Sequence, residues 1–180
     1  MWLQKRTKPL AIYGNHHTIK SVISLMENSG WQSWPDFYPV EFITILETQE
    51  GISPVLETET LRVTSAFGDH FLPTNALRFD FLKCGHSVAY SSDTEPSEEF
   101  VQLAKGAEIM IHESTGSGTG HSSSVEAAEI ANRAGATDLY LIHYQARNQA
   151  LEEMQEQARS VFKGEVYLAR DFETITFDCP

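Results

Sequence analysis

The chain has 180 residues, 41% of them hydrophobic with three Trp and ten Phe, which fits one domain with a packed core and excludes a disordered protein. Its net charge of −12 repels phosphate backbones and argues against a nucleic-acid partner. No apolar run approaches the about 20 residues that span a bilayer, and the N-terminus does not read as a signal peptide, so we expect a cytoplasmic protein in which Cys84 and Cys179 are reduced thiols.

Short apolar runs bounded by turn residues make up the first half of the chain. Apolar residues that recur every three or four positions predict a helix from Thr18 to Met26, with Thr18 as its cap. His16 and His17 are expected in the loop before it. Alternating or continuous apolar runs predict strands at Leu10–Tyr13, Val40–Glu47, Val55–Thr58, Leu61–Ala66 and Ala76–Leu82.

Strand and helix patterns alternate in the second half, which is typical of an α/β protein. Ser97 begins a helix over 97–105, and Ser123 with Glu126 fits a capping box near the start of a helix over Ser122–Ala134. A third, acidic helix is expected over Ala150–Phe162. The predicted strands are Ser87–Tyr90, Ile109–Ile111, Leu139–Ile142, Val166–Ala169 and Thr174–Phe177.

Acidic and imidazole side chains fall at the ends of successive predicted strands. His70, Asp93, Glu113 and His143 each end or closely follow such a strand, and His121 precedes a helix. Singly, each residue also fits a turn, a surface position or a packing role. Together they predict a metal-binding catalytic site, because such groups collect at element ends on a rigid scaffold. A carboxylate that orients a histidine would provide a proton donor for a leaving group.

These motifs resemble the metallo-β-lactamase superfamily, close to its ribonuclease Z-like and arylsulfatase-like branch. SSDT (91–94) is similar to the branch's SGDT, and AEIMIHEST (107–115) is similar to its segment that ends in HEAT. The resemblance continues almost from end to end of the chain. It includes PLAIYG (9–14), GDH with FLPTNALRFDF (68–81), HSS (121–123) beside the branch's HST, and LIHY (141–144) beside its last metal-binding histidine motif.

The resemblance implies a fold and a set of roles. The fold would be α/β, a metallo-β-lactamase-like αββα sandwich of mixed sheets, as a single domain over residues 1–180. Asp93 would bridge two metal ions, zinc or manganese, with His70 and His143 binding one ion each. Glu113 and His121 would handle the leaving-group proton. The implied activity is metal-dependent hydrolysis of a phosphodiester, sulfate or other ester.

The sequence also departs from the family pattern. Ser92 stands where the family has glycine, which makes that turn sterically tighter, and the family signature HxHxDH is absent because NHH (15–17) lacks its spacing. Three of the family's seven ligands have counterparts, so each ion would keep two protein ligands where catalytic zinc usually has three. We therefore expect an N-terminally incomplete fold, its C-terminal two-thirds, with a poorly occupied or metal-free site. The alternative function is a catalytically inactive, metal-free relic or interaction module with the same fold.

The substrate is predicted from spacing and charge. In ribonuclease Z a long arm that grips tRNA lies between the counterparts of His70 and Asp93, whereas 22 residues separate them here. With the net charge of −12, this predicts a small-molecule or ester substrate and not tRNA. An uncovered sheet edge near Leu10–Tyr13 would favour pairing with a second copy, so a homodimer is also expected.

Overall fold

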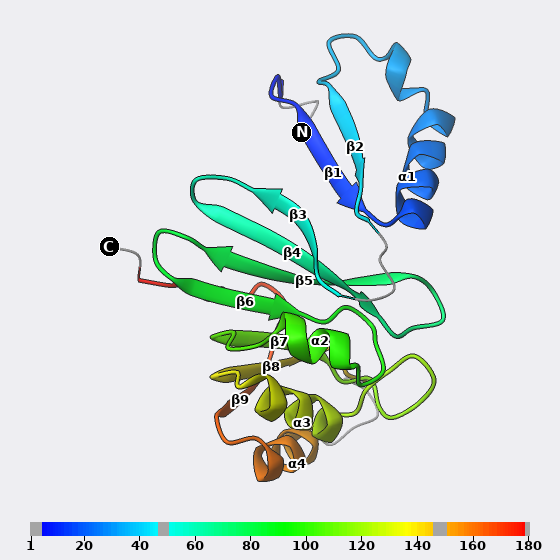
Figure 1. The fold of residues 1–180 in the computed structure, drawn as a ribbon. Helices are drawn as coiled ribbons and strands as arrows, with labels where there is room; N and C mark the ends of the chain where they lie inside the picture. The colour runs from blue at the N-terminus through cyan, green and yellow to red at the C-terminus, as the bar shows by residue number, and fades with distance from the viewer. Residues whose placement is uncertain (1–4, 47–50, 146–150, 179–180) are drawn as a thin grey trace. The chain divides into compact units, whose positions relative to one another are not determined.

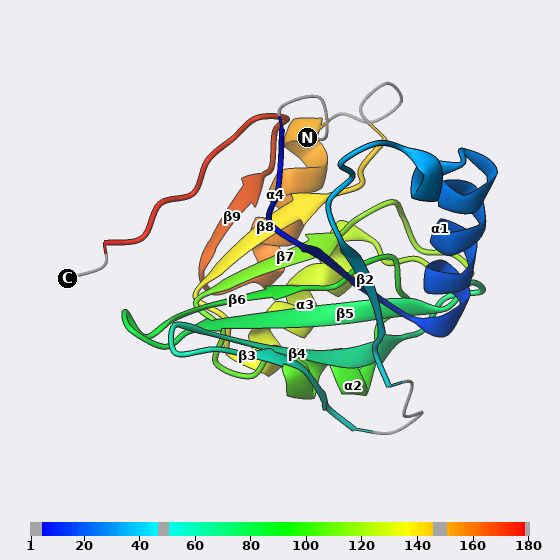
Figure 2. The same cartoon turned by 90° about the horizontal axis from the view of Figure 1, so that it is seen from above.

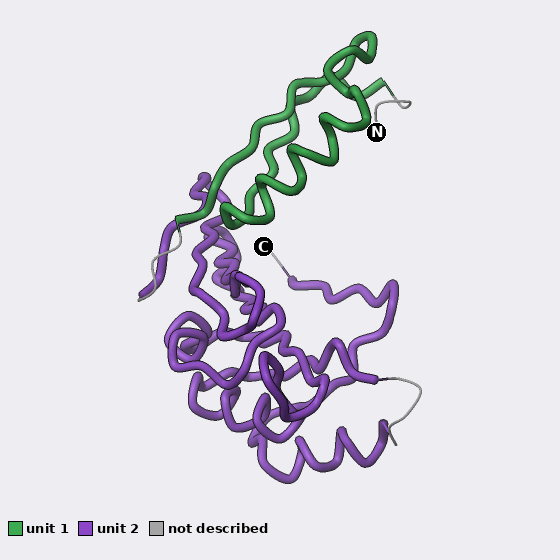
Figure 3. Tube along the Cα trace, turned by 90° about the vertical axis from the view of Figure 1, so that its right-hand side faces the viewer, with its two compact units in different colours: residues 1–47 green, residues 48–180 purple. Residues whose placement is uncertain are grey.

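The computed structural model describes residues 5–46, 51–145 and 151–178. They form two compact units, residues 1–47 and residues 48–180, drawn in different colours in Figure 3. The single domain expected over residues 1–180 stays a prediction. Among the described residues, no helix is long and apolar enough to cross a membrane.

The first unit contains a small parallel sheet and a helix. Strand β1 (Leu10–Gly14) pairs in parallel with β2 (Val40–Thr44), and α1 (His16–Asn28) lies between them in the chain, followed by a short 3₁₀ turn. The helix begins earlier than predicted, because Asn15 and not Thr18 is its cap. The side chain of Asn15 accepts a hydrogen bond from the Thr18 amide at 2.8 Å, a favoured capping arrangement.

The second unit is a seven-stranded mixed sheet in the order β3-β4-β5-β6-β7-β8-β9. Tight connections make β3 to β6 antiparallel, whereas crossovers through helices make β6 to β9 parallel (Figure 1). The strands are β3 (Ser53–Glu57), β4 (Leu61–Gly68), β5 (Thr74–Phe81), β6 (His86–Tyr90), β7 (Ile109–Glu113), β8 (Asp138–Ile142) and β9 (Glu165–Leu168). The predicted α/β class with a mixed sheet is confirmed.

Three helices cover one face of this sheet, as Figures 1 and 2 show. They are α2 (Glu98–Leu103), α3 (Ser124–Ala134) and α4 (Leu151–Val161). The predicted capping box of Ser123 and Glu126 is present at the start of α3. The buried face of α3 is mostly alanine, which allows the helix to pack closely on Leu139 and Leu141 of β8. This dense core holds the strand ends in place.

Two expectations about the segments around His86 are wrong. Residues Thr174–Phe177 do not form a strand; instead the Phe177 ring stacks on His86 at the start of β6, with ring centroids 4.5 Å apart. Cys84, in the β5–β6 turn beside His86, is disulfide-bonded and not a reduced thiol, whereas Cys179 lies outside the described residues. The prediction of reduced thiols rested on the expected cytoplasmic location, which does not indicate which segments of the chain lie close together. The contact of Phe177 with His86 brings the C-terminal segment to the β5–β6 turn. Glu47 and Ala150, at the ends of two predicted elements, also lie outside the described residues.

The His86 contacts predict a pH-dependent stability. His86 Nδ1 lies 2.5 Å from Glu108 Oε2 and Nε2 lies 3.3 Å from the Asp178 carbonyl, and the hydrogen bond to Glu108 is the main reason that the His86 pKa is raised. A raised folded-state pKa stabilises the protein fully below the unfolded value of about 6.5, and this stabilisation is lost as pH rises through the folded pKa. We expect His86→Gln to lower the urea midpoint below pH 6.5 and to change it little above the raised pKa. An equal decrease of the urea midpoint at every pH would show that stacking of His86 on Phe177 alone holds the C-terminal segment.

Candidate metal centre

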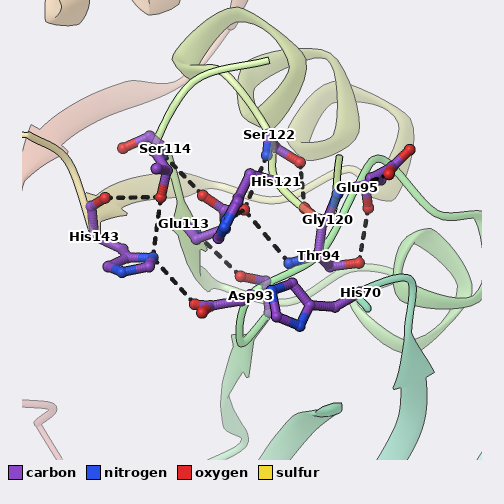
Figure 4. A network of polar contacts seen from close by, with 12 residues as sticks. His70, Asp93, Thr94, Glu95, Glu113, Ser114, Gly120, His121, Ser122 and His143 are labelled. Carbon is purple, nitrogen blue, oxygen red and sulfur yellow. Dashed lines mark hydrogen bonds and ion pairs between the residues drawn. The ribbon is translucent and has the colours of Figure 1, made fainter. Parts of the chain in front are cut away.

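The predicted site residues gather at one edge of the seven-stranded sheet. Strands β4, β6, β7 and β8 run in the same direction, with β5 antiparallel between β4 and β6, so their C-terminal ends meet at this edge. His70, Asp93, Glu113 and His143 lie at or just beyond those ends, and the loop before α3 brings His121 to them (Figure 4). Such edges of α/β sheets are common ligand sites.

The five side chains are close enough to share bound ions. His143 Nδ1 lies 3.1 Å from Asp93 Oδ1, and the His121 ring centroid lies 5.2 Å from that of His70 and 5.7 Å from that of His143. Two groups offer ligand atoms within 4.8 Å of one another: His70, Asp93 and His121, and Glu113, His121 and His143. The structure therefore brings all the predicted residues together. It also places His121, predicted as a proton donor, in both groups.

His70 tests whether the site fits a metal ion. Its Nε2 is buried and has no hydrogen-bond partner among the described residues. Its Nδ1 lies 3.2 Å from both the amide and the carbonyl of Leu72. When Nδ1–H donates to that carbonyl, the Nε2 lone pair is left free, which is the usual arrangement of a metal-binding histidine. Because an unpaired buried nitrogen is costly, the donor set fits a bound cation.

Glu113 is fully buried, and its carboxylate is satisfied by three loops. Oε1 accepts the Ser122 amide at 2.9 Å and the Thr94 amide at 3.4 Å, and it lies 3.0 Å from His121 Nδ1 (Figure 4). Oε2 accepts the Thr115 amide at 2.8 Å. These backbone donors hold the carboxylate in place, and it orients the His121 imidazole through Nδ1.

Hydroxyl groups that the sequence analysis did not single out complete the loops. Ser91 Oγ accepts the Glu113 amide at 3.0 Å, and Ser122 Oγ donates to the Thr94 carbonyl at 2.7 Å. Thr94 Oγ1 accepts the Asp69 amide at 2.9 Å. The sole sequence signal for these roles is the position of small polar residues beside Asp93 and His121, a pattern that turns share.

Two site residues have left-handed backbone conformations. Ser92 has φ of 56° and His143 has φ of 55°. A side chain disfavours this region, so the steric tightness expected at Ser92 is present. The Ser92 hydroxyl donates to the Asn75 carbonyl at 2.7 Å, which offsets part of the strain. Strained backbone of this kind often accompanies functional sites.

His112, next to Glu113, is fully buried. Burial lowers the pKa of His112, so the ring is neutral at physiological pH, and its Nδ1–H donates to the Glu113 carbonyl at 2.7 Å. The ring edge contacts Phe100 of α2, with centroids 5.3 Å apart. His112 therefore contributes packing under the site without adding a charge beside Glu113.

Comparisons with known proteins agree with this geometry. No protein-family model matches the sequence. The chain is 44% identical over 86 residues to ribonuclease Z from Methanothermobacter thermautotrophicus, covering 43% of this chain and 28% of that relative. It is 34% identical over 107 residues to ribonuclease Z from Picrophilus torridus, covering 55% and 34%.

Solved structures share the fold. The short form of human tRNase Z matches with a TM-score of 0.72 at 24% identity, covering 95% of this chain and 69% of that one. The metallo-β-lactamase fold protein YhfI from Bacillus subtilis matches with a TM-score of 0.68 at 24% identity, covering 90% and 63%. The chain therefore has the metallo-β-lactamase fold, and part of its sequence is similar to ribonuclease Z. The sequence matches to these two ribonuclease Z proteins span about a third of the relatives' length.

The metallo-β-lactamase fold implies divalent metal ions, and the donors around His121 fit them. The comparisons also correct the expected partner. The expectation of a small-molecule or ester substrate, with tRNA disfavoured, is wrong, because the relatives are ribonuclease Z proteins and a structural neighbour is a tRNase Z. A net charge of −12 is a sum over the whole surface and does not describe the local field where three histidines meet. The short spacing between His70 and Asp93 excludes an arm only at that position.

Gly120 sets the spacing of the His70 and Phe71 rings in this site. It has φ of 83°, and a Cβ there would lie 2.7 Å from His70 Cδ2 and 3.1 Å from Phe71 Cδ1. We expect Gly120→Ala to displace His70 and weaken Zn²⁺ or Mn²⁺ binding in calorimetric titration. Gly116→Ala is a matched control, because Gly116 also has positive φ (130°) but no described atom within 4 Å of the added Cβ. Equal metal affinity in the two variants would contradict the prediction.

Proposed function

We propose that this chain carries part of a metal-dependent phosphodiesterase centre that acts on RNA, with tRNA as the substrate class. The observation that supports it most is the donor group of His70, Asp93 and His121, in which His70 has an unpaired Nε2 and Asp93 lies 3.1 Å from His143. The names of the relatives supply the RNA substrate.

The residues have distinct roles in this proposal. Asp93, His70 and His143 would hold the metal ions, with the Asp93 carboxylate serving beside both histidines. Bound zinc or manganese supplies positive charge beside the phosphoryl oxygens and lowers the pKa of water. These three side chains are fewer than two catalytic zinc ions use, so full occupancy requires His121 or further donors.

The proton is handled by Glu113 and His121. Glu113 is held by three backbone amides, so its position is set before substrate arrives. It fixes the His121 ring through Nδ1, which leaves Nε2 to carry the proton that the departing oxygen takes. The ring is 23% exposed, so Nε2 can reach a substrate while the carboxylate stays out of water.

The test combines metal binding with cleavage. Purified chain is titrated with Mn²⁺ and Zn²⁺ by calorimetry and incubated with a 3′-extended tRNA precursor. We expect fewer than two ions per chain, and any cleavage to require Asp93. Two tightly held ions would show that other residues complete the ligand set. A chain that binds neither metal nor precursor would contradict the proposal and support a metal-free interaction module.

A further inference from the structure

An exposed aromatic ring stands directly beside the candidate metal centre. Phe71 and Leu72, in the loop between β4 and β5, are 70% and 52% exposed, immediately after His70. Single exposed apolar residues are ordinary on a protein surface. This pair differs because it adjoins a donor group where the proposed function places a phosphodiester.

The loop that carries Phe71 is held firmly. At the start of the loop, the Asp69 carbonyl accepts a hydrogen bond from the Glu95 amide at 2.7 Å. At its end, Thr74 Oγ1 donates to the Asp93 carbonyl at 3.0 Å. His70 Nδ1–H donates to the Leu72 carbonyl at 3.2 Å. The Phe71 ring therefore has a defined position although most of its surface is open to solvent.

Two contacts orient the ring itself. Its centroid lies 4.0 Å from that of His70, with 36° between the ring planes. Gly120 approaches so closely that an added Cβ would lie 3.1 Å from Phe71 Cδ1, and its amide donates to Glu95 Oε1 at 2.7 Å. Phe71 is thus packed against a candidate ligand and a site loop, and exposed elsewhere.

The position of the ring indicates what it binds. Phe71 packs on His70, a member of the donor group beside which the proposed function places a phosphodiester. Stacking of a base on an aromatic side chain requires no cation and accepts any base. Resting on the proposed phosphodiesterase function, we infer that Phe71 is a stacking platform that positions a nucleobase next to the bond to be cleaved.

The test measures binding and not turnover. A fluorescent oligoribonucleotide whose phosphorothioate linkages resist cleavage is titrated by polarisation in the presence of Mn²⁺. We expect Phe71→Ala to weaken binding by about 5- to 150-fold, the usual effect of removing a stacked aromatic side chain, and Phe71→Trp to retain it. Leu82→Ala is the control, because Leu82 is 41% exposed at the opposite end of β5.

A matched oligomer of abasic ribose phosphates separates stacking from other roles. The wild type should bind it as weakly as Phe71→Ala does, and the two proteins should no longer differ. Equal losses on the base-bearing and abasic probes would overturn the inference and make Phe71 a structural residue. So would unchanged binding by Phe71→Ala. A wild type that binds neither probe would overturn the proposed function as well, so the two failures are distinguishable.

Discussion

Replacement of Asp93 by alanine is expected to abolish divalent-metal binding. Its carboxylate belongs to the donor group of His70 and lies 3.1 Å from His143 Nδ1, so it adjoins both predicted histidine ligands. Without it, the two imidazoles keep no carboxylate oxygen between them. Calorimetric titration with Mn²⁺ should show no measurable heat of binding for Asp93→Ala.

The controls separate loss of the site from loss of the fold. The Asp93 side chain is 40% exposed, so its removal should change the free energy of unfolding by about 1 kcal/mol or less. Asp80→Ala removes a different aspartate, one paired with Arg78 on β5, and should leave metal binding intact. Retained binding in Asp93→Ala would mean that Glu113, His121 and His143 form the principal ion site.

We expect Glu113→Ala to lower mainly the stability of the protein, and His121→Ala to lower mainly its rate of cleavage. Glu113→Ala leaves backbone amides of three loops without their acceptor, and each buried donor left unsatisfied costs about 1–3 kcal/mol. His121→Ala should leave stability and metal content nearly unchanged but slow phosphodiester cleavage by about 10²–10⁴-fold. Urea denaturation measures the first effect, and single-turnover cleavage with metal analysis measures the second.

Substrate chemistry sharpens the His121 prediction. A nitrophenolate leaving group needs no proton, so the rate loss in His121→Ala should shrink with bis(p-nitrophenyl) phosphate. The double variant Glu113→Ala/His121→Ala should be little slower than His121→Ala, because the rate losses of two groups that act as one unit do not add. Loss of metal from His121→Ala would instead make His121 a ligand, as its place in both donor groups permits.

The strand ends that build the centre could be predicted from the sequence. The apolar runs before Asp93 and His143 are continuous enough to identify buried parallel strands, and parallel strands present their ends at one edge. The capping box at Ser123 is likewise a local pattern, and it fixes where α3 begins. Local periodicity and capping therefore account for the arrangement of the scaffold.

Contacts between segments far apart in the chain could not be predicted in this way. The Glu113 carboxylate meets amides from loops at 94, 115 and 122, and no spacing rule connects those positions. Phe177 lies in a segment with strand-like composition, yet stacking on His86 places it outside any strand. At α1, Asn15 caps the helix three residues before the predicted start because it caps more strongly than threonine.

The order of strands in the large sheet bears on when the centre can form during folding. Strands β3 to β6 are joined by short reversals, and their pairing closes small loops, whereas β6 to β9 require helical crossovers and contacts between distant residues. His70 comes from the hairpin half, Glu113, His121 and His143 come from the crossover half, and Asp93 lies at the junction. The group of Glu113, His121 and His143 lies wholly in the crossover half, and the group of His70, Asp93 and His121 requires both halves. A folding intermediate in which only the hairpins have formed therefore has no binding site for ions. Affinity for metal is thus a property of the last-formed native contacts, and an ion that binds them stabilises only the fully folded unit.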